Sequence, residues 1–486
     1  MQSISVRRRL TIAVFAGIAV SMVIGDQRCV ALPCQPRPNV LLLLADDQRP
    51  DTIAALGNPI IGTPTLDRLV AGGVAFTRAI CAYPLCHPSR AEILSGMTVF
   101  RNGVQARGRL DGGVVVLPEL LRRAGYRTCH VGKWHTAGTP AERGYDTVEG
   151  MFAPGKIPAE KQLDAMGREA TGYRGWMFRD AAGKPMPEKG VGLTPGISAE
   201  LADAAIRFLN HEKEGNRPFF LHVNFTAPHD PLLSPPGFKG RYDPARMPAP
   251  KNFLPEHPFD HGNLRGRDEL LWPWPRTEQD VREELALYYA EISYLDEQIG
   301  RILDALDATG QADRTVVIFT SDNGLAIGSH GLRGKQNMYE HSIGVPLVIR
   351  GPRMARGFRS SAQCYLRDLF PTICDLAGVP APAGIQSDSL VPILRGENQS
   401  PRQFVVGYFG DAQRMIRTDQ WKLIRYPKIR REQLFDILAD PSEMHDLSAD
   451  PAQAALISRL RGDLGAWLAR HGDPLNPEGR GDNVGR

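Results

Sequence analysis

The feature that most restricts how this chain can fold is a set of short runs that are apolar at nearly every residue. Residues 39–44, 219–225, 315–319 and 345–349 are the clearest of these runs, and 126–131 is a weaker example. Strands that are apolar throughout are buried on both faces, as in parallel sheets covered by helices. Helical patterns alternate with the runs, so we predict βα units and a mainly parallel sheet.

Helical periodicity is clearest in three of the intervals. We expect helices over Ser198–Glu214 with Ser198 as the N-cap, over Thr277–Leu306, and over Asp368–Ala377, which ends at Gly378. Together with the apolar runs, they indicate an α/β fold in which a large mixed, mostly parallel sheet is sandwiched by helices.

The pattern changes after about residue 400. Four short strands are expected over 403–409, 415–418, 421–426 and 433–437, with a tight turn at Asp419-Gln420, and an amphipathic helix follows over 451–470. We therefore expect a main α/β domain over 36–398 that carries the active site. A small antiparallel α+β subdomain over 399–470 and a flexible tail over 471–486 complete the chain.

The N-terminus has the pattern of a targeting segment. Arg7, Arg8 and Arg9 precede an apolar run over 10–24, which is short for a membrane span and typical of a secretory signal. We expect a signal peptide over 1–25 and an exported, periplasmic or extracellular protein without a stable membrane span after signal removal. A retained N-terminal anchor is the alternative.

Composition excludes several partners. A formal net charge of +4, from 58 Lys and Arg against 54 Asp and Glu, gives no reason to expect nucleic acid. The seven cysteines are odd in number and have no CxxC spacing, so zinc is not expected. An exported protein could pair some of them, and at least one thiol is left over.

Polar residues follow the predicted strands at their carboxyl ends. Because parallel sheets bind ligands at that edge, we expect these residues to converge on one site. They are Asp46 and Asp47, Lys133 and His135, His229, and Asp322 and Asn323 with the more distant His330 and Lys335.

The polar residues divide into two chemical sets. Three carboxylates and an amide oxygen form a hard ligand set, which suits Ca²⁺ or Mg²⁺ and argues against zinc or copper. Lys133, Lys335 and Arg90 form a cationic set with the histidines. A divalent metal surrounded by such cations is a site for a tetrahedral oxyanion, sulfate or phosphate.

Residues 86–96, CHPSRAEILSG, raise a chemical conflict. Pro88 suits a first helical turn and Gly96 a helix end, so Cys86 is predicted at a helix N-terminus, where a thiolate would be activated. A soft thiolate binds a hard cation poorly. This site therefore calls for an oxygen nucleophile in that position.

The sequence resembles the type I, formylglycine-dependent sulfatases of the alkaline phosphatase superfamily. Cys86-His-Pro88-Ser-Arg90, continuing to Ser95-Gly96, matches the family signature CxPxR…(T/S)G. PNVLLLLADDQR, GKWH, APHDP, TSDNG, GLRGKQNMYEHS and DLFPTICDLAGV follow the family order between Pro38 and Leu447. The resemblance implies an alkaline phosphatase-like fold and, in character, a bacterial secreted arylsulfatase or carbohydrate sulfatase.

The resemblance also implies roles for the residues. A maturation enzyme that recognises Cys86-Pro88-Arg90 oxidises the cysteine to formylglycine, whose hydrate attacks sulfur. One Ca²⁺, with Mg²⁺ as the alternative, is held by Asp46, Asp47, Asp322, Asn323 and the modified Cys86. Lys133, Lys335 and Arg90 offset sulfuryl charge, His229 with Lys335 protonates the leaving alcohol, and His135 accepts the proton that releases sulfate. His330 is a pocket candidate only.

The resemblance indicates the reaction more clearly than it indicates the substrate. A sulfated carbohydrate is the first expectation, with choline sulfate and aryl sulfates open. A phosphonate or phosphate ester hydrolase of the same superfamily is the nearest alternative, and a non-catalytic glycan-binding relative is a remote one. Two irregular segments, 151–195 and 236–276, are expected at the rim; Trp272 and Trp274 could stack on a sugar, although we favour loop anchors.

Overall fold

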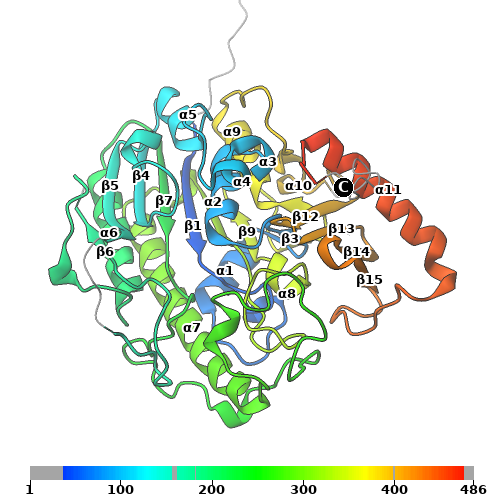
Figure 1. Cartoon of the computed structure of the whole chain (residues 1–486). Coiled ribbons are helices and arrows are strands. Elements are labelled where there is room, and N and C mark those ends of the chain that lie inside the picture. The colour runs from blue at the N-terminus through cyan, green and yellow to red at the C-terminus, as the bar shows by residue number, and fades with distance from the viewer. Residues whose placement is uncertain (1–36, 156–160, 181, 398–399, 476–486) are drawn as a thin grey trace, which may run out of the picture. The chain divides into compact units, whose positions relative to one another are not determined.

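A nine-stranded sheet forms the centre of the computed structural model, which describes residues 37–475 apart from 156–160, 181 and 398–399 (Figure 1). The expected signal peptide and residues 476–486 of the expected tail lie outside the described residues. The strand order is β10-β2-β9-β8-β1-β7-β4-β5-β6. In chain order the strands are β1 (Asn39–Ala45), β2 (Val74–Phe76), β4 (Arg127–Lys133), β5 (Thr147–Pro154), β6 (Trp176–Arg179), β7 (Phe219–Asn224), β8 (Thr315–Ser321), β9 (Leu347–Arg350) and β10 (Phe358–Ser360).

The sheet is mixed and mostly parallel, as predicted. β1 lies between β8 and β7 and pairs in parallel with both, with Asn39 opposite Thr315 and Val40 opposite Phe220. Only β6 and β9 of this sheet run against the others. The five strands β8, β1, β7, β4 and β5 are therefore parallel neighbours, and their carboxyl ends lie along one edge.

Helices cover both faces of the sheet, as the apolar runs predicted. Leu41 and Leu43 of β1 pack in one apolar cluster with α1 (Pro64–Gly72), α6 (Ile197–His211) and α7 (Glu278–Ala308). Leu42 and Leu44 pack in a second cluster with α2 (Cys86–Ser95), α5 (Leu117–Arg123) and α9 (Leu369–Ala377). Because alternate residues of a strand point to opposite faces, one apolar strand supplies both cores.

The helix ends confirm the predictions in two cases and correct them in one. Thr277 caps α7 in a capping box with Asp280, and α9 ends at Gly378 with φ 62°. Ser198 is not the N-cap of α6, because the helix starts one residue earlier, after Gly196. Ile197 is buried in the core on the first turn, so tertiary packing sets this boundary.

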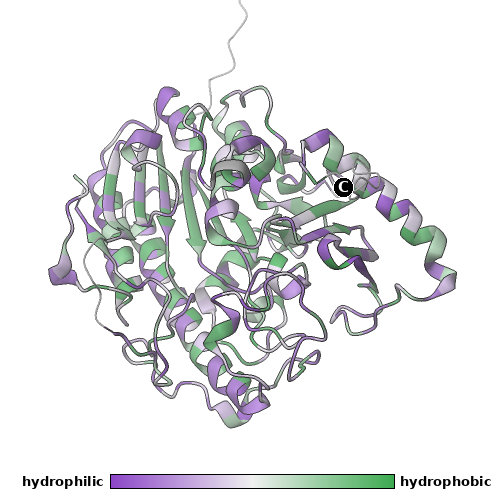
Figure 2. Ribbon diagram, viewed as in Figure 1, coloured by the Kyte–Doolittle hydropathy of each residue, from purple (hydrophilic) through white to green (hydrophobic). Residues whose placement is uncertain are grey.

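A second, antiparallel sheet lies near the C-terminus. Its strands are β12 (Val405–Phe409), β13 (Gln413–Arg417), β14 (Trp421–Tyr426) and β15 (Arg431–Asp436), followed by α11 (Ala454–His471). Ile416, Leu423 and Leu464 belong to the same apolar cluster as Leu42, so this sheet and α11 pack onto the central sheet's helices. Figure 2 shows the central strands as hydrophobic and α11 as alternately polar and apolar.

The remaining elements are short. They are α3 (Val99–Asn102), α4 (Val104–Arg107), α8 (Glu340–Ile343), α10 (Val391–Leu394) and the pair β3 (Ala79–Ile80) and β11 (Cys364–Tyr365). Within the part of the chain that the structure describes, no helix combines the length and apolar character that a membrane span requires. Trp272 is an anchor, as we favoured, because its buried indole donates a hydrogen bond to Glu284 of α7 (2.7 Å).

Candidate active site

Four neighbouring parallel strands end at one site, which confirms the predicted convergence. Asp322 and Asn323 follow β8, Asp46 and Asp47 follow β1, and His229 lies in the segment after β7. Lys133 is the last residue of β4, and His135 follows two residues later. The sheet therefore brings together residues that are up to 277 positions apart, from Asp46 to Asn323.

The acidic residues form a cluster with open ligand positions. The Asn323 amide nitrogen donates to Asp47 Oδ1 (2.7 Å), and the Asp47 backbone N–H donates to Asp322 Oδ1 (3.2 Å). Ligand atoms of Asp46, Asp47, Cys86 and His229 all lie within 4.8 Å of one another. Among the described residues, the buried Asn323 Oδ1 has no hydrogen-bond partner, so it can accept a cation as an oxygen ligand.

Three cationic side chains contact these carboxylates directly. Lys133 Nζ lies 2.6 Å from Asp46 Oδ2, and Lys335 Nζ lies 2.6 and 2.7 Å from the two oxygens of Asp47. Arg90 donates through Nε to Asp322 (2.8 Å), and its Nη2 is buried without a hydrogen-bond partner among the described residues.

The charges of the site balance before any ligand binds. Lys133, Lys335 and Arg90 offset the three buried carboxylates of Asp46, Asp47 and Asp322, so a divalent cation would make the site positive by two charges. A positive site of this kind attracts an oxyanion. Nη2 of Arg90, which lies 3.8 Å from Asp46 Oδ1 and makes no hydrogen bond to any described residue, offers such an anion a fixed hydrogen-bond donor.

The two outer carboxyl groups have opposite pKa shifts. Burial opposes ionisation of Asp46, but Lys133, His229, Arg90 and Lys335 hold its pKa well below the ordinary value. Burial and the charge of Asp46 raise the pKa of Asp322 to about 6. Ionisation of these two carboxyl groups is therefore opposed overall only at Asp322, whose ionised form a divalent cation would stabilise.

Cys86 is the first residue of α2, as predicted, and only 3% of it is exposed. Its Sγ lies 3.2 Å from Asp46 Oδ1 and 3.1 Å from Lys335 Nζ. The expected activation of the thiol by the helix terminus is wrong, because burial and the charge of Asp46 raise the pKa of Cys86 well above the ordinary value. The residue stands at the centre of the site as a neutral thiol.

The two site histidines are buried differently and both are neutral at pH 7. Burial and Lys335 lower the pKa of His229, whose Nδ1–H donates to the Asp230 carbonyl (2.7 Å) and whose Nε2 lies 3.7 Å from Asp47. Burial and Lys133 lower the pKa of His135 to about 2. Its half-buried ring stacks on His87 and meets the edge of Trp176.

His330 does not lie with the other predicted residues. Its ring stacks on Tyr339 (3.9 Å between centroids) in a separate aromatic and histidine cluster, and its backbone N–H donates to the Asn252 carbonyl (2.7 Å). The tight turn at His330, with φ 54°, directs this residue to the segment after 250, whereas Lys335 reaches Asp47.

Tyr173 is a site residue that the sequence analysis missed. Its buried phenol donates to Asp46, and its ring contacts those of His229 (4.8 Å) and Trp176 (4.9 Å). Its turn packs closely on the site because Gly172 has no side chain; a Cβ there would lie 2.4 Å from the Asp230 carbonyl oxygen. The sequence TGYRGW signals a tight turn, but nothing in it indicates which residues the turn approaches.

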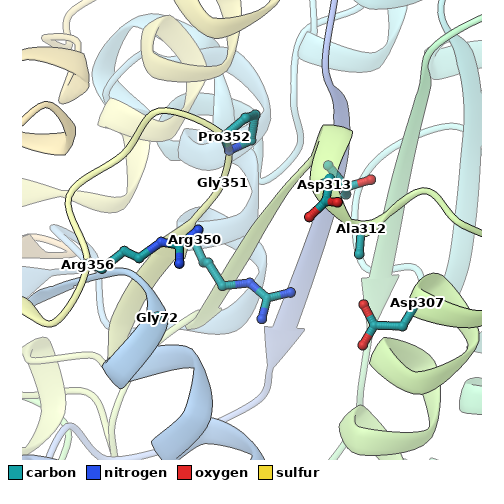
Figure 3. A pocket seen from close by; sticks show the side chains of 9 residues that line it. Gly72, Asp307, Ala312, Asp313, Arg350, Gly351, Pro352 and Arg356 are labelled. Atoms are coloured by element: carbon teal, nitrogen blue, oxygen red, sulfur yellow. The ribbon is translucent and has the colours of Figure 1, made fainter.

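A cavity of about 290 Å³ lies over the cluster. Its walls include Cys86, Lys133, His135, Tyr173, Trp176, His229, Arg267, Asp268, Lys335 and Gln336. A different cavity, of about 250 Å³, lies where β8 begins and contains Arg350, Arg356, Asp307 and Asp313 (Figure 3). That cavity collects none of the predicted site residues, since it is at the opposite end of β8 from Asp322.

Comparisons with protein families give one match across most of the chain. The model of the Sulfatase family matches residues 38–379. A second model, described as the C-terminal part of N-sulphoglucosamine sulphohydrolase, matches residues 328–469.

Individual relatives are distant but match over most of their length. N-acetylglucosamine-6-O-sulfatase of Bacteroides thetaiotaomicron is 27% identical, over 85% of this chain and 82% of its own. Choline-sulfatase of Rhizobium meliloti is 29% identical, over 85% of this chain and 83% of its own. Arylsulfatase of Clostridium perfringens is also 29% identical, over 87% and 93%.

Two solved structures have the same fold. One, a protein in complex with its substrate D-glucosamine-2-N,6-O-disulfate, is 26% identical with a TM-score of 0.73, over 91% of this chain and 100% of that one. The other, phosphonate monoester hydrolase of Agrobacterium radiobacter, is 25% identical with a TM-score of 0.74, over 90% and 96%.

Proposed function

Because this chain belongs to the sulfatase family and is a sulfuric ester hydrolase, we propose that it releases sulfate from a sulfated saccharide. It would use a formylglycine made from Cys86 and one bound calcium ion. The observation that carries this proposal is the placement of Cys86. Its Sγ lies within 3.2 Å of both Asp46 and Lys335, between the acidic cluster and the cations.

The donor set supports a hard divalent cation. Asp46, Asp47, Asp322 and Asn323 present oxygen atoms at the edge of the sheet, and Asn323 Oδ1, which has no hydrogen-bond partner in the described part of the chain, is suited to one more bond. These four residues and the modified residue 86 would hold Ca²⁺, with Mg²⁺ as the alternative. The cation would supply positive charge for the sulfuryl oxygens and lower the pKa of the attacking hydroxyl.

The nucleophile has to be an oxygen, since a neutral buried thiol beside Asp46 is a poor one. Converted to formylglycine and hydrated, residue 86 would supply a hydroxyl that attacks sulfur and a second hydroxyl that allows sulfate to leave as the aldehyde reforms. A maturation enzyme that recognises Cys86, Pro88 and Arg90 is the partner this requires.

The chain's own side chains would manage charge and protons. Lys133 and Arg90 would donate to the sulfuryl oxygens, where removing such a donor costs about a hundredfold to a thousandfold in rate. His229, whose one proton is on Nδ1 at pH 7, would first take a second proton on Nε2 from Lys335 and would then pass it to the leaving alcohol oxygen. His135, neutral because of its burial, would accept the proton of the second hydroxyl.

A saccharide is the favoured carrier of the sulfate. Two relatives support it by name, the N-acetylglucosamine-6-O-sulfatase and the protein solved with a glucosamine disulfate. The choline-sulfatase and the arylsulfatase among the relatives support choline sulfate and aryl sulfates as alternative substrates. The phosphonate monoester hydrolase structure supports a second candidate, hydrolysis of phosphonate or phosphate esters at the same site.

Export and the division of the chain into domains belong to the same proposal. Residues 1–25 would direct export to the periplasm or the extracellular space. Residues 36–398 would act as the catalytic domain and 399–470 as the small subdomain.

Two measurements test the proposal together. Peptide mass spectrometry of protein made with a maturation enzyme should show residue 86 with one oxygen in place of sulfur and two fewer hydrogens. Release of inorganic sulfate is then measured on sulfated saccharides, with phosphate and phosphonate esters for comparison. Cys86→Ala, folded but inactive, is the control. Converted protein that hydrolyses phosphonate or phosphate esters much faster than sulfate esters would overturn the assignment of sulfate as substrate.

A further inference from the structure

A larger cavity, of about 520 Å³, adjoins the active-site cavity. It lies beyond β4 at the same edge of the sheet, between the loop of residues 134–140 and the strands β5 and β6. His135 lines both cavities. Strands β5 and β6 also contribute to this shared wall. Pro154 of β5 lines the larger cavity, and Trp176 of β6, its partner in the sheet, lines the active-site cavity.

The lining of this side cavity is positively charged. It contains Arg109 and Arg179, and none of the described residues that line it is acidic. The pKa values of His87 and His135 are lowered, mainly by burial, so the two arginines supply the charge. Glu142 keeps its negative charge near this wall, where its carboxylate accepts the backbone N–H of Thr139 (2.7 Å), but its side chain does not line the cavity.

Arg179 is held in place without losing its charge. Its Nη1 donates to the Gly183 carbonyl (2.8 Å) and its Nη2 to the Pro154 carbonyl (2.6 Å). Carbonyl groups fix the guanidinium but do not neutralise it, and no ion pair joins Arg179 to a carboxylate among the described residues. An arginine fixed in this way has further N–H donors for an anion.

The rest of the lining is mostly apolar, with His87, His135, Thr136 and Thr139 as its polar side chains. Trp134, Met151 and Ala153 are buried side chains of this lining, which also includes Pro140 and Pro154. The volume is in the usual range for small-molecule sites, and aromatic and aliphatic walls pack against the C–H faces of a sugar ring.

From the shared wall and the charge of its lining, we infer that the side cavity binds a second anionic group of the substrate, on the saccharide ring next to the sulfated one. The inference rests on the proposed function and narrows it to acidic saccharides. A carboxylate or a second sulfate would bind Arg109 and Arg179 while the reacting sulfate lies over Cys86. Choline sulfate, whose organic part is a cation, would be disfavoured by the same two charges.

The test compares ligands that differ in one charge. Sulfated disaccharides that contain a uronic acid, and the same disaccharides with the uronate methyl-esterified, are measured as inhibitors of 4-nitrophenyl sulfate hydrolysis. Calorimetry on the same pairs measures binding independently of turnover. The free acid should bind about tenfold more tightly than the ester, as one charge-assisted contact of about 1.4 kcal/mol predicts.

Variants assign that preference to the cavity. Arg109→Glu reverses an exposed charge, and Arg179→Gln removes the charge but keeps amide donors for the Pro154 carbonyl. Both together change the charge of the lining from two positive charges to one negative charge, so they should reduce the acid-to-ester ratio to one or below. Arg68→Glu is the control, because Arg68 is exposed on α1 and lines neither cavity.

The outcomes separate this inference from the proposed function. A wild-type ratio near one, a ratio that survives in the double variant, or an equal loss in Arg68→Glu would each overturn the side cavity as an anion subsite. Failure of converted enzyme to hydrolyse any sulfate ester would instead overturn the proposed function, and calorimetry would still report on the cavity.

Discussion

Replacement of Lys335 by methionine should destabilise the calcium-free protein far more than the calcium-bound protein. The Lys335 ammonium is fully buried and lies 2.6 and 2.7 Å from the two oxygens of Asp47. Removing one partner of a buried ion pair leaves an uncompensated charge, which costs about 3–5 kcal/mol. Methionine has a similar length and no charge, so it changes packing little.

Calcium should remove most of that cost. A bound cation becomes the partner of Asp47, so the loss of the ammonium is expected to cost only about 1 kcal/mol when calcium is present. By linkage, the difference of about 3 kcal/mol must appear as tighter calcium binding to Lys335→Met, on the order of a hundredfold.

The assay is equilibrium urea unfolding followed by tryptophan fluorescence, with EDTA or with excess calcium, on protein whose Cys86 is unconverted. Lys422→Met is the matched control. Lys422 is also fully buried and paired, with Glu340 (2.9 Å) and Glu443 (2.7 Å), in the C-terminal sheet away from the proposed cation. Its replacement should cost the same with and without calcium.

The effect should not depend on pH between 7 and 9, where Asp322, whose pKa is raised to about 6, stays ionised. Asp47 and its neighbours raise the pKa of Lys335 well above the ordinary value of 10.5 despite its burial. When the pKa of a lysine is higher in the folded state than in the unfolded state, its charge stabilises the protein fully at pH values below the unfolded-state pKa. The stabilisation is lost only as the pH rises through the folded-state pKa. An equal loss in EDTA and in calcium, or a loss below about 1 kcal/mol in EDTA, would refute the assignment of Asp47 as a cation ligand.

Two further changes test groups outside the metal ligands. Burial raises the pKa of Glu291 to about 7, so ionisation of Glu291 opposes folding at pH values above its ordinary pKa of 4.5. Glu291→Gln should therefore stabilise the protein at pH 8 by on the order of 3 kcal/mol and should have no such effect at pH 4. Urea unfolding at the two pH values measures the difference. Equal effects at both pH values would contradict this. Tyr173→Phe keeps the ring on His229 but removes the hydrogen bond to Asp46, so we expect kcat/KM to fall about tenfold and the free energy of unfolding to fall by about 1 kcal/mol. Tyr83→Phe, a control at a half-buried phenol that accepts the Gly410 N–H, should leave kcat/KM unchanged.

The sheet and most of the catalytic cluster could be predicted from local patterns. A strand that is apolar on every residue has one stable placement, between two layers of helices, and parallel strands bring their carboxyl ends to a common edge. Asp46, Lys133, His229 and Asp322 could therefore be assigned to one site before any contact was known. The CxPxR pattern around Cys86 added the reaction class.

Other features depended on contacts between distant segments, which no local pattern encodes. Tyr173 reaches Asp46 from a segment without periodicity, and His330 turns toward Asn252 although Lys335 enters the site. The thiol of Cys86 gained a raised pKa because burial and Asp46 together outweigh the helix terminus.

The sequence by itself determined the layered fold and the chemistry of the site, because hydrophobic periodicity and the position of polar residues at strand ends are local properties of the chain. Tertiary structure decided the electrostatics within the site and the cavity beside it. The burial and the electrostatic environment of a side chain, and the shape of a cavity, depend on residues from segments that are far apart in the sequence. The two arginines of the side cavity, at residues 109 and 179, come from two such segments.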